Sequence, residues 1–175
     1  MNISNMCILV VEDEIELRET VAEVLKDVTP HVLSAEDGIE ALKIFSINQV
    51  ALVVSDIKMP NMTGLQLLRE IRSKDSDIPF IFLTAHSQKN YMAEAFRLGA
   101  TDFIEKPFDI KILLKMCKSA FELGLAILVA EKEIEDSFKD NPHSIEKIKK
   151  LKECTKKIRL MEIENSINDQ KKAKL

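Results

Sequence analysis

The sequence predicts an α/β fold in which an open sheet of five parallel strands is covered by helices on both faces and followed by a helical extension. Two observations predict it. Short apolar runs alternate five times with longer segments whose apolar residues recur at helical spacing. The runs are apolar throughout, which is typical of strands buried on both faces. Repeated strand–helix units of this kind favour a doubly wound parallel sheet.

The individual elements can be placed in order along the chain. The expected strands cover residues 6–11, 31–35, 51–55, 79–84 and 102–106. The expected helices cover residues 14–28, 38–48, 64–74 and 90–99, and a fifth begins near Asp109. The first helix shows the pattern best, because one of its faces carries Leu17, Val21, Val24, Leu25 and Val28.

Polar side chains stand at the ends of four of the five expected strands. Glu12 and Asp13 follow the first strand, Asp56 the third, Thr84 ends the fourth and Lys106 the fifth. Each has an ordinary explanation when taken alone, since Asp13 and Thr84 could cap helices and Lys106 could be a solvated loop residue. Carboxyl ends of parallel strands meet at one edge of a sheet, where sites form. We therefore expect these groups to share a site.

The residue types at this edge indicate phosphate chemistry. Three clustered acids repel one another unless a cation lies between them, and carboxylate oxygens suit Mg²⁺. A lysine and a hydroxyl nearby suit the oxygens of a phosphoryl group. The third strand leads into a rigid turn, "DIKMPNMTG", that begins with Asp56. The pattern predicts a site that places phosphate on an aspartate.

Four motifs at matching spacing carry a resemblance to a known family. They are the acidic pair in "VVEDE", the turn "DIKMPNMTG", the segment "FLTA" and the segment "LGATDFIEKPF". Over roughly residues 5–120 the sequence resembles the receiver domain of two-component response regulators, the CheY-like family. The resemblance implies a flavodoxin-like fold with strand order 2-1-3-4-5. It also implies that a sensor histidine kinase or a phosphotransfer protein is the partner that donates phosphate.

The resemblance further implies which residues bind metal and accept phosphate. Asp56 is expected to be the phosphoacceptor. Mg²⁺, the expected cofactor, would be bound by Asp13, Asp56 and the main-chain carbonyl of Lys58, with Glu12 acting through a water molecule. The chain would assist its own phosphorylation and dephosphorylation, and its sequence shows no separate catalytic output motif.

Other site residues are expected to hold the phosphoryl group and respond to it. Thr84 and Lys106 would hold phosphoryl oxygens, and Phe103 matches an aromatic switch position, although plain core packing is an equal alternative. The face of the fourth helix, fifth strand and fifth helix would change most. Lys58 and His86 lie at positions that are expected to tune phosphate lifetime. The peptide bond before Pro107 is expected to be cis.

The chain divides into an expected receiver domain at 1–120 and a helical extension at 121–175. The extension continues the fifth helix up to a break at Asn141 and Pro142, and helical spacing resumes after Ser144. A nearly heptad-spaced apolar stripe runs along the first part and predicts a coiled-coil homodimer: Met116, Ala120, Leu123, Ile127, Ala130, Ile134 and Phe138. The second part has a thinner apolar line: Ile148, Leu151, Cys154, Ile158 and Met161.

Charge separates the same two parts and leaves other interpretations open. Residues 139–175 carry 11 Lys and Arg against 6 Asp and Glu, whereas the whole chain has a net charge of −4. A nucleic-acid-binding regulator that uses this basic helix is possible, but we do not favour it, since the segment has no aromatic platform. The chain could also be part of a longer effector protein.

Composition indicates the compartment. The three cysteines, Cys7, Cys117 and Cys154, are far apart and show no metal-ligand spacing, which favours structural thiols in a reducing environment. No apolar run approaches the length of a membrane span, and the N-terminal run is not preceded by basic residues. We therefore expect a cytoplasmic protein without membrane contact.

Overall fold

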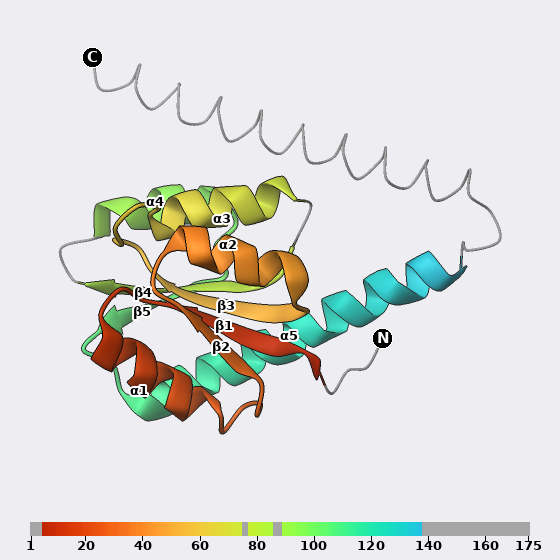
Figure 1. Cartoon of the computed structure of the whole chain (residues 1–175), viewed down its shortest axis with the longest axis horizontal. Helices are drawn as coiled ribbons and strands as arrows, with labels where there is room; N and C mark the ends of the chain where they lie inside the picture. Colours follow the sequence, from red (N-terminus) through yellow and green to blue (C-terminus); the bar gives the residue numbers. More distant parts are fainter. Residues whose placement is uncertain (1–4, 75–76, 86–88, 138–175) are drawn as a thin grey trace, which may run out of the picture. The chain divides into compact units, whose positions relative to one another are not determined.

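The computed structural model describes residues 5–74, 77–85 and 89–137 of the chain. Strands and helices alternate strictly in these residues (Figure 1), as the sequence predicts. The strands are β1 (Cys7–Val11), β2 (Val32–Ala35), β3 (Val50–Asp56), β4 (Phe80–Ala85) and β5 (Asp102–Lys106). The helices are α1 (Ile15–Leu25), α2 (Gly38–Ile47), α3 (Gly64–Ser73), α4 (Lys89–Arg97) and α5 (Ile110–Ser137).

The five strands form one parallel sheet in the order β2-β1-β3-β4-β5. This confirms the expected doubly wound fold and its strand order. Helices α2, α3 and α4 lie on one face of the sheet, and α1 and α5 lie on the other (Figure 1). Because all strands run the same way, their carboxyl ends lie at a single edge of the sheet.

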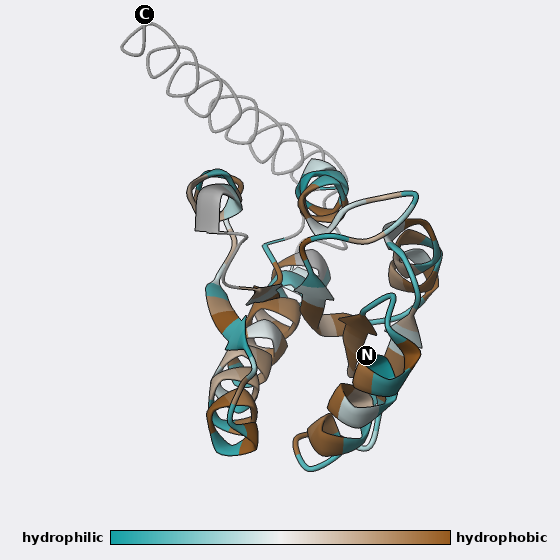
Figure 2. Cartoon of the chain, turned by 90° about the vertical axis from the view of Figure 1, so that its left-hand side faces the viewer, coloured by the Kyte–Doolittle hydropathy of each residue, from teal (hydrophilic) through white to brown (hydrophobic). Residues whose placement is uncertain are grey.

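The pleat of the strands divides the apolar residues between two cores. Leu9 and Val53 contribute to the core beneath α2, α3 and α4, whereas Val10 and Val54 contribute to the core beneath α1 and α5. Every residue of β1 and β3 is buried, because both faces of these central strands are covered. Figure 2 shows the hydrophobic colour in the strands and in both helix layers.

Local sequence signals set where two of the helices begin. The Thr63 side-chain oxygen accepts from the Gln66 backbone N–H at the start of α3, and the Gln66 side-chain oxygen accepts from the Thr63 backbone N–H, so the pair forms a capping box. Asp37 caps α2 by accepting a hydrogen bond from the Glu40 backbone N–H. Both helices begin next to the carboxyl edge of the sheet, and their caps therefore help to shape the loops at that edge.

Helix α5 comes unusually close to the sheet at Gly124. A Cβ atom at this position would lie 1.7 Å from the carbonyl oxygen of Ala51, so only glycine permits the observed packing. The first four turns of α5 bury Leu113, Cys117, Ala120 and Phe121 in the core shared with α1. The expected apolar stripe is therefore divided. Ala120 and the partly buried Met116 belong to the domain's own core, whereas Leu123 is 50% exposed.

The chain divides into two units, residues 1–130 and 131–175. The second unit contains the end of α5, in which Lys132 and Asp136 form an ion pair at 3.2 Å and Ile134 is 43% exposed. Phe138 and the expected helix after Ser144 lie outside the described residues. None of the described helices is long and apolar enough to cross a bilayer.

Candidate functional site

The carboxyl edge of the sheet brings three carboxylates together. Glu12 and Asp13 follow β1, and Asp56 is the last residue of the neighbouring strand β3. One ligand oxygen from each of the three lies within 4.8 Å of the others. Glu12 and Asp56 are buried and Asp13 is exposed, so the cluster opens to solvent on the Asp13 side. The sequence interpretation of Asp13 as a helix cap is not realised, because Glu14 occupies the cap position of α1.

Lys106 crosses from β5 to this acidic cluster. Its ammonium group donates hydrogen bonds to Glu12 Oε2 at 2.7 Å and to Asp56 Oδ2 at 2.5 Å. Burial lowers the pKa of Lys106, but the hydrogen bonds and charges of Asp56 and Glu12 outweigh this, so the pKa lies above its ordinary value. The lysine is therefore a fixed positive charge between two carboxylates that are far apart in the sequence.

Glu12 is the most deeply buried of the acids, with 1% of its surface exposed. Burial raises the pKa of Glu12 above its ordinary value, while the hydrogen bond and charge of Lys106 oppose this rise. Arg18 of α1 holds the backbone here, since its Nη1 donates to the carbonyl oxygens of Glu12 at 2.6 Å and Asp13 at 3.3 Å. Without Lys106, the buried Glu12 carboxylate would face Asp56 with no cation between them.

The loop between β3 and α3 is folded tightly around Asp56. The backbone N–H of Lys58 donates to Asp56 Oδ1 at 3.0 Å, and the N–H of Gly64 donates to the Ile57 carbonyl at 3.0 Å. Gly64 is packed so closely that a Cβ there would lie 2.1 Å from the Asp56 carbonyl oxygen. The Lys58 ammonium lies over the Tyr91 ring of α4, 5.5 Å from its centroid. Lys58 thus has its backbone at the site and its side chain toward α4.

Thr84 and Phe103 lie on neighbouring strands near the cluster. Thr84 is a buried residue within β4, so it does not cap a helix, and its hydroxyl donates to the Ala85 carbonyl at 3.2 Å. Phe103 of β5 is half-buried and stacks on Phe82 of β4 at a centroid distance of 5.7 Å. It also contacts Phe96 of α4 at 4.7 Å. An aromatic chain therefore joins the sheet to the exposed surface of α4.

The expectation for Pro107 is confirmed, whereas that for His86 stays a prediction. The peptide bond between Lys106 and Pro107 is cis. His86, expected to tune phosphate lifetime, lies outside the described residues.

Three residues that support the site were not singled out from the sequence: Arg18, Asp37 and Asn61. Asn61 adopts a left-handed conformation with φ 61°, and its side chain donates to Asp37 Oδ2 at 2.7 Å. Asparagine within the turn "PNMTG" and aspartate before Gly38 were the available signals, because both are typical of turns and helix caps. Nothing in the spacing indicates that the two side chains meet.

The donor set suits a hard divalent cation. Carboxylate oxygens and a backbone carbonyl are the ligands that Mg²⁺ prefers, and the ligand oxygens of Glu12, Asp13 and Asp56 already lie close enough to share one ion. The close packing of Gly64 on Asp56 and the Lys58 N–H bond to Asp56 hold the third-strand ligand in place. The residues present therefore fit the expected metal.

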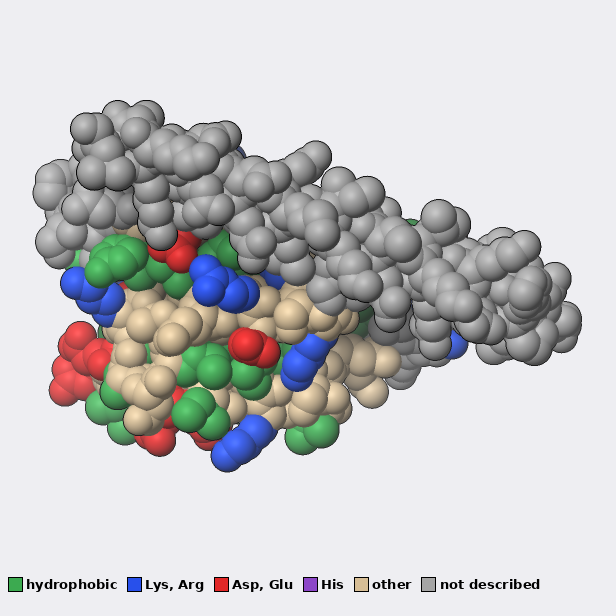
Figure 3. All heavy atoms as spheres, turned by 90° about the horizontal axis from the view of Figure 1, so that it is seen from above, with side chains coloured by type: hydrophobic (Ala, Val, Ile, Leu, Met, Phe, Trp, Pro, Cys, Tyr) green, Lys and Arg blue, Asp and Glu red, His purple; other side chains and the backbone are tan. Residues whose placement is uncertain are grey.

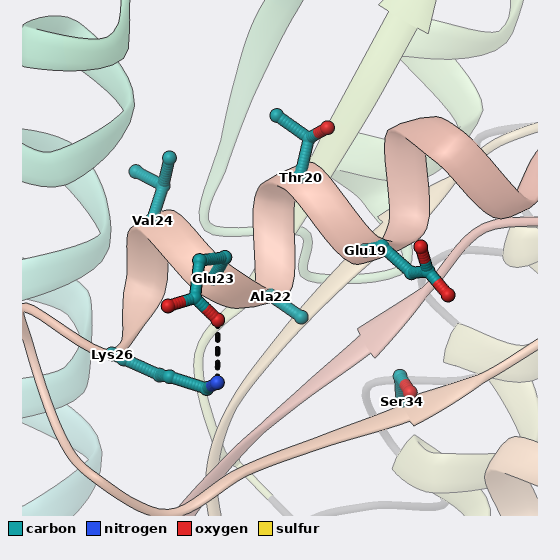
Figure 4. A pocket seen from close by; sticks show the side chains of 7 residues that line it. All are labelled: Glu19, Thr20, Ala22, Glu23, Val24, Lys26 and Ser34. Carbon is teal, nitrogen blue, oxygen red and sulfur yellow. Dashed lines mark hydrogen bonds and ion pairs between the residues drawn. The ribbon is translucent and has the colours of Figure 1, made fainter.

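A separate hollow of about 640 Å³ lies along α1 and β2 (Figure 4). It is lined by Glu19, Thr20, Ala22, Glu23, Val24, Lys26 and Ser34. Its Glu23 and Lys26 form an ion pair at 2.5 Å, and both side chains are largely exposed. It shares no residue with the acidic cluster, and we assign it no role.

These features define a doubly wound α/β domain with an acidic cluster and a bridging lysine at the carboxyl edge of its sheet. The model of the response regulator receiver domain matches residues 8–118. The chain belongs to this family.

Known relatives show the same family by sequence and by structure. The chain is 39% identical over 114 residues to "Response regulator RR06" of Streptococcus pneumoniae, a match that covers 65% of this chain and 52% of that protein. It is 42% identical over 113 residues to "Probable transcriptional regulator ycf27" of Cyanophora paradoxa, covering 65% and 47%. These matches span about half the length of the relatives.

Solved structures agree with this assignment. The receiver domain of NtrX from Brucella abortus is 35% identical, with a TM-score of 0.62 over 66% of this chain and 98% of that one. A response regulator receiver domain protein from Clostridium thermocellum is 28% identical, with a TM-score of 0.62 over 71% and 98%.

Proposed function

We propose that the chain is a phosphorylated switch of a two-component system, in which Asp56 accepts a phosphoryl group from a phosphohistidine. The donor would be a sensor histidine kinase or a phosphotransfer protein. The observation that carries the proposal is the cluster of Glu12, Asp13 and Asp56 with the Lys106 ammonium between two of them. Family membership supports it independently.

The transfer follows from the charges at the site. An oxygen of the Asp56 carboxylate attacks phosphorus in line, the new P–O bond forms, and the P–N bond to the imidazole breaks with its electron pair leaving on nitrogen. Bound Mg²⁺ would offset the negative charge of the transferring oxygens. Asp13, Asp56 and the Lys58 carbonyl would hold the ion, with Glu12 acting through water. Lys106 would exchange its bond to Asp56 for one to a phosphoryl oxygen.

The response is proposed to pass through Thr84 and Phe103. Thr84 lies on β4, next to β3 and β5 in the sheet, and its hydroxyl would turn from the Ala85 carbonyl to a phosphoryl oxygen. Phe103 already contacts Phe96, which is 56% exposed on α4. A rotation of Phe103 would therefore alter the surface formed by α4, β5 and α5. Lys58 is proposed to influence how long the phosphate lasts, since its backbone contacts Asp56.

Replacement of the acceptor tests this function. Incubation of the chain with Mg²⁺ and acetyl phosphate should add one base-labile phosphoryl group, measured as a single mass increment. Asp56→Asn should abolish the increment, because an amide oxygen is a poor nucleophile, while Asp102→Asn on the exposed start of β5 should keep it. A phosphoryl group that persists in Asp56→Asn would refute the assignment.

We further propose that residues 1–120 form the phosphoacceptor domain and that residues 121–175 form a helical extension that mediates homodimerisation. Leu123 and Ile134 are large apolar residues exposed on α5, and such residues on one helix favour a helical partner. In the described part of the face seen in Figure 3, acidic, basic and hydrophobic side chains are interspersed. Nucleic-acid binding through the basic residues of 139–175, which lie outside the described residues, is not favoured.

A reducing compartment, and hence the cytoplasm, is proposed for the same chain. Cys7 and Cys117 are buried free thiols. Burial raises the pKa of Cys7 to about 11 and that of Cys117 to about 12, so both are protonated packing residues.

A further inference from the structure

The loop between β3 and α3 is tied to a distant part of the chain by one side-chain hydrogen bond. Asn61, at the tip of this loop, donates from Nδ2 to Asp37 Oδ2 at 2.7 Å across 24 positions of sequence. Its φ of 61° is a left-handed conformation that asparagine tolerates better than most residues. The bond therefore holds a loop tip whose backbone is already confined.

Asp37 uses its two carboxylate oxygens for two different structures. Oδ1 accepts the Glu40 backbone N–H at 2.8 Å and caps α2, while Oδ2 accepts from Asn61. The residue is 8% exposed, so water offers little competition for either bond. The hydrogen bond from the Glu40 N–H, and to a smaller extent that from the Asn61 amide, holds the pKa of Asp37 below its ordinary value. The Asp37 carboxylate therefore stays ionised.

A second contact joins the same two segments. Gly38, the first residue of α2, packs against Met62, and a Cβ at position 38 would lie 2.6 Å from the Met62 side chain. Residues 37 and 38 thus meet residues 61 and 62 side by side. The start of α2 forms a platform on which the tip of the loop rests.

The other end of this loop is part of the phosphorylation site. The Lys58 N–H is bonded to Asp56 Oδ1, and Gly64 is packed on the Asp56 carbonyl. Only a few residues separate Lys58 and Gly64 from Asn61 at the tip of the loop. The Met62 N–H also donates to the Pro60 carbonyl at 2.6 Å, which restricts this part of the loop further. A displacement of Asn61 would therefore move the Lys58 backbone.

We propose that Asp37 and Asn61 form a positioning pair that holds the Lys58 carbonyl where a divalent cation at Asp13 and Asp56 can use it. The effect of this pair on metal binding rests on the proposed function. The hydrogen bond between Asp37 and Asn61, which we call the tether, is observed in the structure itself. Neither residue touches the reacting atoms.

An exchange of donor and acceptor tests the pair. Asp37→Asn keeps an oxygen to cap α2 but turns a second amide donor toward Asn61. Asn61→Asp keeps the left-handed turn but faces Asp37 with another carboxylate. The double variant Asp37→Asn with Asn61→Asp restores one donor and one acceptor with their roles reversed.

Mg²⁺ affinity of the full chain is measured by calorimetry. Each single variant should bind Mg²⁺ about three- to tenfold more weakly, which corresponds to the ordinary net contribution of one hydrogen bond. The Mg²⁺ affinity of the double variant should return to within about twofold of that of the wild type, because its hydrogen bond is restored. Two substitutions that affected only stability would not compensate each other in metal affinity. Equal Mg²⁺ affinity in the wild type and both single variants would overturn the proposal.

Amide hydrogen exchange without metal separates this inference from the proposed function. In each single variant the amides of Lys58 and Met62 should exchange faster than in the wild type, and the double variant should restore slow exchange. Unchanged exchange in the single variants would overturn the tether. A wild type that binds no Mg²⁺ would instead contradict the proposed metal site, and with it the positioning role of the pair. The hydrogen-exchange rates would still show whether the Asp37–Asn61 bond holds the loop.

Discussion

The ammonium of Lys106 lies 2.5 Å from the carboxylate of Asp56, joining the ends of β5 and β3 across 50 positions of sequence. The same ammonium also bonds Glu12, so one cation serves two acids. This arrangement makes the pKa values of Lys106 and Glu12 interdependent.

Removal of the Lys106 charge should raise the pKa of Glu12 further. In Lys106→Met the opposing hydrogen bond is lost, while burial and the charge of Asp56 continue to disfavour the Glu12 carboxylate. Carbon-detected NMR of the side-chain carboxyls, recorded against pH without metal, would measure this. Lys132→Met, which removes an ion pair of α5, should leave the Glu12 pKa unchanged. A Glu12 pKa that falls in Lys106→Met would contradict the geometry.

Substitution of the acids should affect Mg²⁺ unequally. Asp13→Ala removes a proposed direct ligand and should weaken binding by about tenfold or more, whereas Glu12→Ala removes one that acts through water and should weaken it less. Calorimetric titration of both variants with Mg²⁺ would show the order. Asp27→Ala, just beyond α1, serves as a control of equal charge change. Equal Mg²⁺ affinities of the wild type and Asp13→Ala would contradict the proposed metal site.

Gly124→Ala should destabilise the fold although alanine favours helices. The added Cβ would overlap the Ala51 carbonyl, and overpacking of this kind costs about 1–3 kcal/mol. Urea denaturation would measure the loss in free energy of unfolding. Ser119→Ala, an exposed position in the same helix, should change it by no more than about 0.5 kcal/mol. Similar free energies of unfolding for the two variants would contradict the close contact between Gly124 of α5 and Ala51 of β3.

Loss of the Asp37 carboxylate should flatten part of the acid unfolding profile. The pKa of Asp37 is lowered in the fold from its ordinary value of 3.8, so its stabilisation is present above that value and is lost as pH falls through the folded pKa. The difference in unfolding free energy between the wild type and Asp37→Asn should therefore be constant near neutral pH and shrink below 3.8. Denaturation at a series of pH values would measure it, and a difference that grows on acidification would contradict the assignment.

Charged residues on the exposed side of α5 should prevent self-association. Ile127→Glu and Ile134→Glu should sediment as monomers and still accept phosphate at Asp56, because neither residue belongs to the acidic cluster of Glu12, Asp13 and Asp56. Lys118→Glu, placed on the opposite side of the helix from Ile127, is the matched control and should remain dimeric. A wild type that sediments as a monomer at micromolar concentration, phosphorylated or not, would exclude the proposed dimer.

The fold and the acidic edge could be predicted because each depends on local pattern. Five apolar runs locate the strands, and polar residues such as Asp56 and Lys106 at their ends must share an edge once the strands are parallel. The order of the strands came from the resemblance, since periodicity does not specify which strands are neighbours.

The remaining details depend on contacts between distant segments. Ala120 lies on the same stripe as Leu123 in the sequence, yet only the packing of α5 on the sheet decides that the first is buried and the second exposed. The bond between Asp37 and Asn61 joins two turns whose separate signals say nothing of each other. A glycine inside a helix generally weakens it, whereas Gly124 is the point where α5 meets Ala51.

The contact at Gly124 also limits how the length of β3 can change. Ala51 meets α5 near the start of this strand, and Asp56 ends it at the acidic cluster. A one-residue deletion between them would break one of these two contacts and exchange the residues that face each core. Chimaeras made by joining segments of related chains should therefore keep residues 51–56 as an undivided block. Insertions are better placed outside that block, where neither constraint applies.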